Sequence, residues 1–169
     1  LFGDMLATQL ADAGVDIGCV RRTAEAKTAL AFVSLDAQGE RSFSFYRPPA
    51  ADLLFRADDF DAACFDGLAV FHVCSNSLTE PAIAGATLAG MRRARAAGAL
   101  VSMDLNLRPA LWPRDVDPAP RVWSALEEAD LVKLSVGELD FLAQAAGGAD
   151  AALHRLGNAR AQCVLVTDG

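Results

Sequence analysis

The sequence predicts an α/β fold, in which a mainly parallel β-sheet is flanked by helices and accompanied by a small β-hairpin. Two observations predict this class. Apolar runs of strand length alternate with helical patterns over residues 66–169, and this alternation is typical of βαβ units. Residues 41–47, RSFSFYR, alternate between polar and aromatic side chains, which indicates a hairpin strand rather than a helix.

Composition and length restrict the class of protein. The chain has 169 residues, of which 53% are hydrophobic, and this is enough to bury a core as one domain or as part of a larger one. A net charge of -7 argues against nucleic acid as a partner, because a phosphate backbone attracts Lys and Arg. No run reaches the roughly 18 apolar residues of a membrane span, so a membrane partner is not expected.

The cysteines indicate the compartment. Cys19, Cys64, Cys74 and Cys163 are widely spaced and form no CxxC pair, and the chain has only two histidines, so a zinc site is not expected. Most of the four lie in apolar surroundings, which is typical of reduced core thiols in a cytosolic protein. We therefore expect packing cysteines and a cytoplasmic location.

The amino-terminal third is predicted to contain a helix, a short strand and the hairpin. Apolar side chains have helical spacing over residues 2–10, and Gly14 is a typical helix end. Residues 15–20 are expected to form a short strand. A glycine-containing turn joins the β-prone residues 28–36 to 41–47, and the hairpin is interpreted either as a sheet edge or as a flap over a ligand.

The next segment leads from short helices into the main sheet. Residues 50–65 are acidic and aromatic and are expected to form short helices. Residues 68–74 are a continuous apolar run, which is typical of a strand buried on both faces. Ser77 and Glu80 have the spacing of a capping box for a helix that continues to Gly98, a typical helix end.

Further strands and helices complete the predicted sheet. Strands are expected at 99–103, 130–134 and 163–166, the last of them buried, and helices at 118–128 and 135–156 with a break at 147–148. Parallel strands joined by helices are connected in a right-handed sense, so their carboxyl ends lie at one edge of the sheet.

Polar side chains follow the strand at 99–103. Asp104, Asn106 and Arg108 are two residues apart, so on an extended backbone they would project from the same face. Ligands of open α/β sheets bind beyond the carboxyl ends of the strands, and this trio is suited to a phosphorylated or acidic ligand. A surface loop containing an Asp–Arg pair is the alternative.

Two further strand ends carry polar groups. Ser135 and Glu138 follow the strand at 130–134, and two interpretations of the glutamate remain open: it closes a capping box with Ser135, or it orders water or Mg²⁺ at the sheet edge. Thr167 and Gly169 follow the last strand, where a hydroxyl and a glycine allow a phosphate to approach the backbone. The alternative is an ordinary turn, because any turn that ends a strand has similar residues.

In this order, the motifs resemble the ribokinase-like carbohydrate kinases, also called the PfkB family, and within it the fructokinases. The most specific match is DLNLRP at 104–109, followed by LW at 111–112. Supporting matches are GER at 39–41, FYR at 45–47, CSNSL at 74–78, KLSVGE at 133–138 and VTDG at 166–169. Order and spacing agree with the family along nearly the whole chain.

The resemblance implies a ribokinase-like fold with a hairpin lid at about 28–47 and an α/β core at 1–20 and 66–169. It implies an ATP-dependent kinase that phosphorylates a sugar hydroxyl, with fructose as the expected substrate, ATP and Mg²⁺ as cofactors, and a homodimer formed through the lid. The implied roles are sugar binding by Tyr46, Arg47, Asn106 and Arg108, transition-state stabilisation by Arg108, ordering of Mg²⁺ and the ATP phosphates by Ser135 and Glu138, and the nucleotide-binding turn at Thr167 and Gly169.

Two parts of the family pattern are absent from the chain. These are the amino-terminal Gly-Gly motif, which contacts sugar, and the carboxy-terminal Gly-Ala-Gly-Asp segment, which contains the general base. We therefore expect the middle half of a kinase of roughly 300 residues, inactive on its own. Two other functions stay open: 2-keto-3-deoxygluconate kinase, whose acidic substrate Arg47 and Arg108 would clamp, and a non-catalytic sugar- or nucleotide-binding module.

Overall fold

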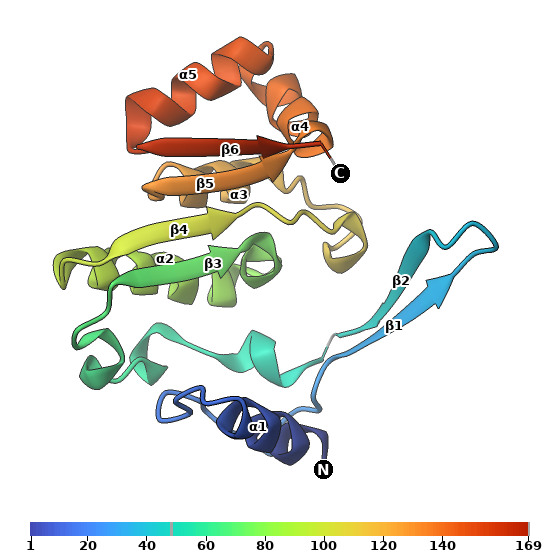
Figure 1. The fold of residues 1–169 in the computed structure, drawn as a ribbon, viewed down its shortest axis with the longest axis vertical. Coiled ribbons are helices and arrows are strands. Elements are labelled where there is room, and N and C mark those ends of the chain that lie inside the picture. The colour runs from blue at the N-terminus through green and yellow to red at the C-terminus, as the bar shows by residue number, and fades with distance from the viewer. Residues whose placement is uncertain (48, 169) are drawn as a thin grey trace.

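The computed structural model describes residues 1–47 and 49–168 and contains two separate sheets (Figure 1). Strands β1 (Leu30–Leu35) and β2 (Arg41–Tyr46) form an antiparallel hairpin. A parallel sheet has the order β3-β4-β5-β6, and its strands are Val70–Cys74, Leu100–Asp104, Leu131–Ser135 and Cys163–Thr167. The predicted α/β class with a small hairpin is confirmed.

Helices connect the parallel strands. The α-helices in the described ranges are α1 (Phe2–Asp12), α2 (Pro81–Ala96), α3 (Ala119–Leu126), α4 (Val136–Ala146) and α5 (Ala149–Ala159). Short 3-10 helices are η1 (Ala51–Leu54), η2 (Ala57–Asp59), η3 (Ala62–Phe65), η4 (Ser75–Leu78) and η5 (Pro109–Leu111). None of the helices in the described part of the chain combines the length and apolar character that a bilayer crossing requires.

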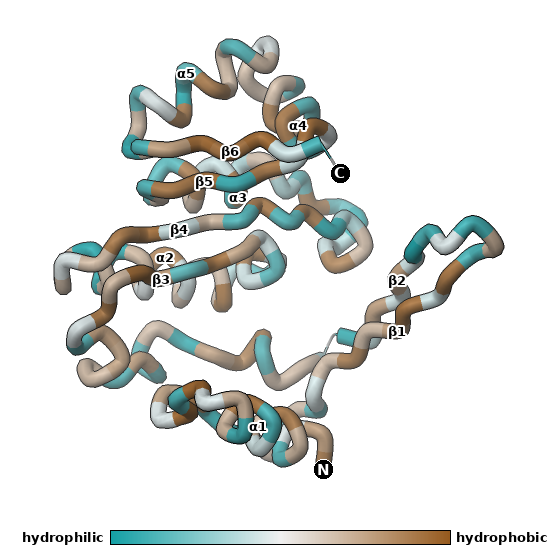
Figure 2. Tube along the Cα trace, viewed as in Figure 1, coloured by the Kyte–Doolittle hydropathy of each residue, from teal (hydrophilic) through white to brown (hydrophobic). Residues whose placement is uncertain are grey.

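The core lies on one face of the parallel sheet. Along β4, Val101 and Met103 have no exposed surface, and along β5, Val132 and Leu134 are equally buried. These residues alternate with half-exposed ones, because successive side chains of a strand point to opposite faces. Helices α2 and α3 lie behind the sheet in Figure 1, and Figure 2 shows the apolar residues along β5 and β6.

Two strands are more exposed than their sequences predict. Residues 68–74 and 163–166 were expected to be buried strands, but β3 and β6 are the two edges of this sheet. Val70 in β3 is exposed, as are Leu165 and Val166 in β6. An apolar run indicates a strand, but its position within the sheet depends on pairing with distant segments, so the prediction of burial was wrong.

Two local predictions are wrong as well. Residues 15–20 form no strand, because the Asp16 carboxylate accepts a hydrogen bond from the Gly18 N–H at 2.8 Å and closes a turn. Ser77 does not cap α2. Its hydroxyl donates to the Cys74 carbonyl at 3.0 Å within η4, and α2 begins after Glu80 without a side-chain cap.

The expectation of reduced packing cysteines is wrong for three of the four. Cys19 and Cys64 form a disulfide, with their Cα atoms 5.9 Å apart, and it joins the loop after α1 to η3. Cys163 is a free thiol but is exposed. Sequence spacing gives no signal for the pair, since the two residues are separated by 45 positions.

The carboxyl end of α2 is tied to the turn between α3 and β5 by one carboxylate. Glu128 accepts hydrogen bonds from Arg92 at 2.9 Å and from Arg95 at 2.5 Å. Burial raises the pKa of Glu128, but the hydrogen bonds and charges of Arg95 and Arg92 outweigh it and bring the pKa below its ordinary value of 4.5. The carboxylate therefore stabilises the folded state only while it is ionised.

We predict that Glu128→Gln in the full-length protein lowers the free energy of unfolding at about pH 7 by about 1 to 3 kcal/mol, since it replaces two charge-assisted hydrogen bonds. A group with a lowered folded-state pKa stabilises above its unfolded pKa, and this stabilisation is lost as the pH falls through the folded value. The deficit of the variant should therefore shrink below about pH 4.5.

Urea titrations across this pH range test the prediction, with Glu25→Gln as a control that removes the same charge from an exposed site. A deficit of Glu128→Gln that stays the same at every pH would contradict the prediction, because it would not depend on ionisation of the carboxylate. Coincident curves would show that the two ion pairs contribute no net stability.

Candidate active site

The carboxyl ends of the four parallel strands meet at one edge of the sheet. Cys74 lies opposite Asp104, Asp104 opposite Lys133, and Ser135 opposite Thr167. The strand ends that the sequence singled out are therefore neighbours in space, as predicted. Asp104 forms an ion pair with Lys133 at 3.3 Å across the sheet, while its Oδ1 has no hydrogen-bond partner among the described residues.

The chain turns sharply after β4. The extended backbone ends at Asp104, and Asn106 has a φ of +39°, a left-handed conformation that Asn adopts more readily than most residues. Leu105 is fully buried, and its carbonyl accepts from the Ser75 N–H at 3.2 Å. The prediction that an extended backbone aligns Asp104, Asn106 and Arg108 was therefore wrong.

Glu138 holds this turn in place. One carboxylate oxygen accepts from the Ser135 N–H at 2.8 Å, and the Ser135 hydroxyl accepts from the Glu138 N–H at 3.3 Å, so the predicted capping box is confirmed. The other oxygen accepts from the Leu107 N–H at 2.7 Å. A single side chain thus joins the start of α4 to the loop that presents Arg108.

Arg108 lies against the hairpin. Its guanidinium is 5.7 Å from the centre of the Phe43 ring in β2, a distance at which a cation is attracted to an aromatic face. The hairpin forms its own two-stranded sheet, so it is not an edge of the parallel sheet. Its contact with the loop after β4 agrees instead with a flap beside the strand ends.

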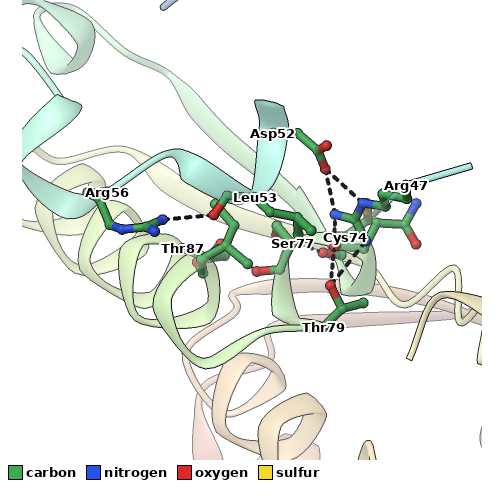
Figure 3. A network of polar contacts seen from close by, with 10 residues as sticks. Arg47, Asp52, Leu53, Arg56, Cys74, Ser77, Thr79 and Thr87 are labelled. Atoms are coloured by element: carbon green, nitrogen blue, oxygen red, sulfur yellow. Dashed lines mark hydrogen bonds and ion pairs between the residues drawn. The ribbon is translucent and has the colours of Figure 1, made fainter. Parts of the chain in front are cut away.

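A buried arginine connects the hairpin to the core at its base (Figure 3). Arg47 is only 8% exposed and donates to Asp52 at 2.6 and 2.8 Å, to the Asn76 carbonyl at 2.6 Å and to the Thr79 hydroxyl at 3.0 Å. We call Arg47, Asp52, Asn76 and Thr79 the hairpin-base cluster. These bonds use four of the five N–H groups of the guanidinium.

A cavity of about 210 Å³ lies next to this cluster. Its lining combines apolar hairpin residues with polar groups from the core, and includes Leu30, Ala31, Phe45, Arg47, Asp52, Asn76 and Leu111. Such a mixture is typical of small-molecule sites. A larger cavity of about 370 Å³ is lined by residues near α3, α4 and α5, including Trp123 and Arg155, but by none of the residues that the sequence predicted.

The remaining predicted site residues are less closely gathered. Tyr46 ends β2 and is 78% exposed. Ser135 and Thr167 are paired in register at the ends of β5 and β6. Gly169 lies outside the described residues. Sequence reasoning missed Asp52, Thr79 and the Asn76 carbonyl, because their link to Arg47 spans up to 32 positions and has no local pattern.

Comparison with known proteins identifies the class to which this fold and site belong. The chain is a member of the pfkB family of carbohydrate kinases, whose model matches residues 1–169. Within this family, one relative is fructokinase-1 of Zea mays: the chain is 44% identical to it over 168 residues, which is 99% of this chain and 52% of the relative. The family resemblance seen in the sequence is confirmed.

Solved structures agree. Fructokinase from Xylella fastidiosa has a TM-score of 0.94 at 57% identity, covering 99% of this chain and 54% of that one; its form with bound ATP has a TM-score of 0.93 at 56% identity, covering 99% and 53%. Fructokinase from Vibrio cholerae O395, bound to fructose, ADP and a calcium ion, has a TM-score of 0.82 at 30% identity, covering 99% and 54%. The chain spans about half the length of these relatives.

We predict that Asp52→Asn in the full-length protein lowers the free energy of unfolding by about 1 to 3 kcal/mol, because it leaves the buried Arg47 guanidinium without its anionic partner. The exposed Asp58 supplies a matched control in the same segment, and Asp58→Asn should stay within about 0.5 kcal/mol of wild type. Denaturant titrations measure both values. If the two substitutions change the free energy of unfolding equally, the hairpin-base cluster contributes nothing specific to holding the hairpin.

Proposed function

We propose that the protein containing this chain is an ATP-dependent sugar kinase that phosphorylates fructose. The observation that carries the proposal is the meeting of Arg108, the hairpin and the ends of β4, β5 and β6 at one edge of the sheet. Phosphoryl transfer requires cations and hydrogen-bond donors at the phosphate and a lid that excludes water. The names of the relatives, and the ATP, ADP and fructose bound to two of them, support the same function.

In this proposal the sugar occupies the cavity at the base of the hairpin. A sugar has hydroxyl groups that both donate and accept hydrogen bonds, and Asp52 and Asn76 provide acceptors in the cavity wall. Tyr46 and Asn106, the other predicted sugar contacts, do not line this cavity. Arg47 has one N–H group left after its four hydrogen bonds, so its contribution is chiefly to hold the cavity wall.

The transferring phosphate lies nearer to Arg108. Charge spreads over the phosphoryl oxygens in the transition state, and a guanidinium fixed in advance stabilises this charge without reorganising. The hydroxyls of Ser135 and Thr167 face the ATP phosphates from adjacent strand ends. We assign none of the side chains in this chain as the base that accepts the proton of the sugar hydroxyl.

Magnesium fits beside Glu138 through water. Each carboxylate oxygen accepts one backbone N–H, and a carboxylate oxygen has a further lone pair, so Glu138 retains the capacity to accept from a metal-bound water. Mg²⁺ usually keeps several waters when it accompanies nucleotide phosphates. When bound, the ion would neutralise phosphate charge, while Glu138 keeps the Arg108 loop in position.

We further propose a homodimer formed through the hairpin and a cytoplasmic location. Val33 and Leu35 are 56% and 67% exposed on β1, and exposed apolar side chains on a strand are typical of protein interfaces. The proposed use of ATP as the phosphate donor supports the cytoplasmic location. The Cys19–Cys64 disulfide counts against this location, because disulfides are rare in the reducing cytosol.

We predict that the full-length protein releases ADP from ATP when fructose is present, and that Arg108→Ala lowers kcat by about 10²- to 10³-fold, as expected for the loss of one well-placed donor. The exposed Arg114 serves as the control, since Arg114→Ala removes the same group from a position outside the site. Thermal unfolding of both variants should match wild type.

A coupled assay of ADP release tests the proposal, and 2-keto-3-deoxygluconate is assayed beside fructose. The names of the relatives favour fructose over this acidic sugar and over a non-catalytic module. No ATP use with either sugar contradicts the proposed function. Turnover with 2-keto-3-deoxygluconate but not with fructose would support a sugar kinase and show that fructose is not its substrate.

A further inference from the structure

The side chain of Arg108 has few restraints from its own loop. Within residues 1–47 and 49–168, its one hydrogen bond runs from Nη1 to the carbonyl of the adjacent Leu107, at the long distance of 3.5 Å. The backbone around it is well held, since Glu138 accepts the Leu107 N–H and η5 begins at Pro109. A long, flexible side chain therefore extends from a fixed backbone.

The partner of the guanidinium belongs to the hairpin. The Phe43 ring lies 5.7 Å from the Arg108 guanidinium carbon. Phe43 is itself oriented by Phe45, whose ring is nearly parallel at 8° and 6.1 Å away, and by its position opposite Val33 in the hairpin register. Because Phe43 is 41% exposed, burial in a core does not explain its orientation.

The backbones of the two segments also lie close together. Strand β2 lies beside η5, the turn that directly follows Arg108, while the base of the hairpin is held by the buried Arg47. A displacement of the hairpin would carry the Phe43 ring away from the guanidinium. The position of Arg108 is thus linked to the position of the hairpin.

We propose that Phe43 is a positioning residue, whose ring holds the Arg108 guanidinium in the orientation that phosphoryl transfer needs. This inference rests on the proposed kinase function and adds a residue to it. Since the ring acts through its aromatic face, its effect depends on aromaticity rather than on apolar volume. The hairpin thereby couples coverage of the sugar to placement of the arginine.

A substitution series in the full-length protein tests the proposal with fructose and ATP as substrates. Phe43→Leu keeps an apolar side chain but removes the aromatic face, and should lower kcat about 5- to 30-fold with a smaller change in KM. Phe43→Tyr and Phe43→Trp keep the face and should stay within about threefold of wild type. Phe32→Leu, on the opposite face of the hairpin, is the control and should match wild type.

A double-mutant cycle shows whether the effect passes through the arginine. In an Arg108→Ala background, Phe43→Leu should lower kcat by less than about twofold further, because the group that the ring positions is gone. A Leu variant with wild-type kcat overturns the inference, as does an equal loss in the presence and absence of Arg108. A loss that Tyr and Trp fail to rescue also overturns it, since packing alone would then explain the effect.

Wild-type activity separates this inference from the function on which it rests. If the wild-type protein shows no sugar-dependent ATP use, the proposed function fails. If the wild type turns over and Phe43→Leu does so equally well, only the role of Phe43 fails. Thermal unfolding of each variant confirms that the compared proteins are folded.

Discussion

The carboxylate of Glu138 is the constraint on which the arrangement of the site depends. Its two oxygens accept backbone N–H groups from residues in different segments, Ser135 at the start of α4 and Leu107 in the loop after β4. The loop can therefore leave the sheet with Asn106 in a left-handed conformation and still have a defined path. Ser75 holds the same loop from another side, because its N–H and hydroxyl donate to the carbonyls of Leu105 and Asn106.

The hairpin adds a second level to this arrangement. Arg47 fixes its base through a buried guanidinium whose donors are almost all used, and burial of a charge is tolerated when it is paired and hydrogen-bonded in this way. Phe43 then reaches the guanidinium of Arg108. One arginine holds the hairpin against the core, and the hairpin in turn holds the arginine that we assign to phosphoryl transfer.

Local patterns in the sequence predicted most of the elements, because periodicity and capping depend on neighbouring residues. The alternation of residues 41–47 predicted β2, and the spacing of Ser135 and Glu138 predicted the capping box. What failed depends on distant segments. The edge positions of β3 and β6 and the pairing of Cys19 with Cys64 could not be predicted from a single run of sequence.

The candidate site divides in the same way. Its location at the carboxyl ends of the strands followed from βαβ topology, and Arg108 and Glu138 were found there by pattern and by family resemblance. The hydrogen bonds from Leu107 to Glu138 and from Arg47 to Asn76 and Thr79 were not predicted, because each joins residues about 30 positions apart. The bond from Arg47 to Asp52 spans five positions but has no sequence pattern that distinguishes it. Such contacts become visible only after folding.

The most direct test of the central claim is a crystal structure of the full-length protein with fructose and a non-hydrolysable ATP analogue. We expect the sugar in the cavity bounded by Phe45, Asp52 and Asn76, and the terminal phosphate beside the guanidinium of Arg108. The Glu138 carboxylate should still accept from the Leu107 N–H. A sugar bound away from the hairpin, or an Arg108 directed away from the phosphate, would contradict the claim that these strand ends and the hairpin form the phosphoryl-transfer site.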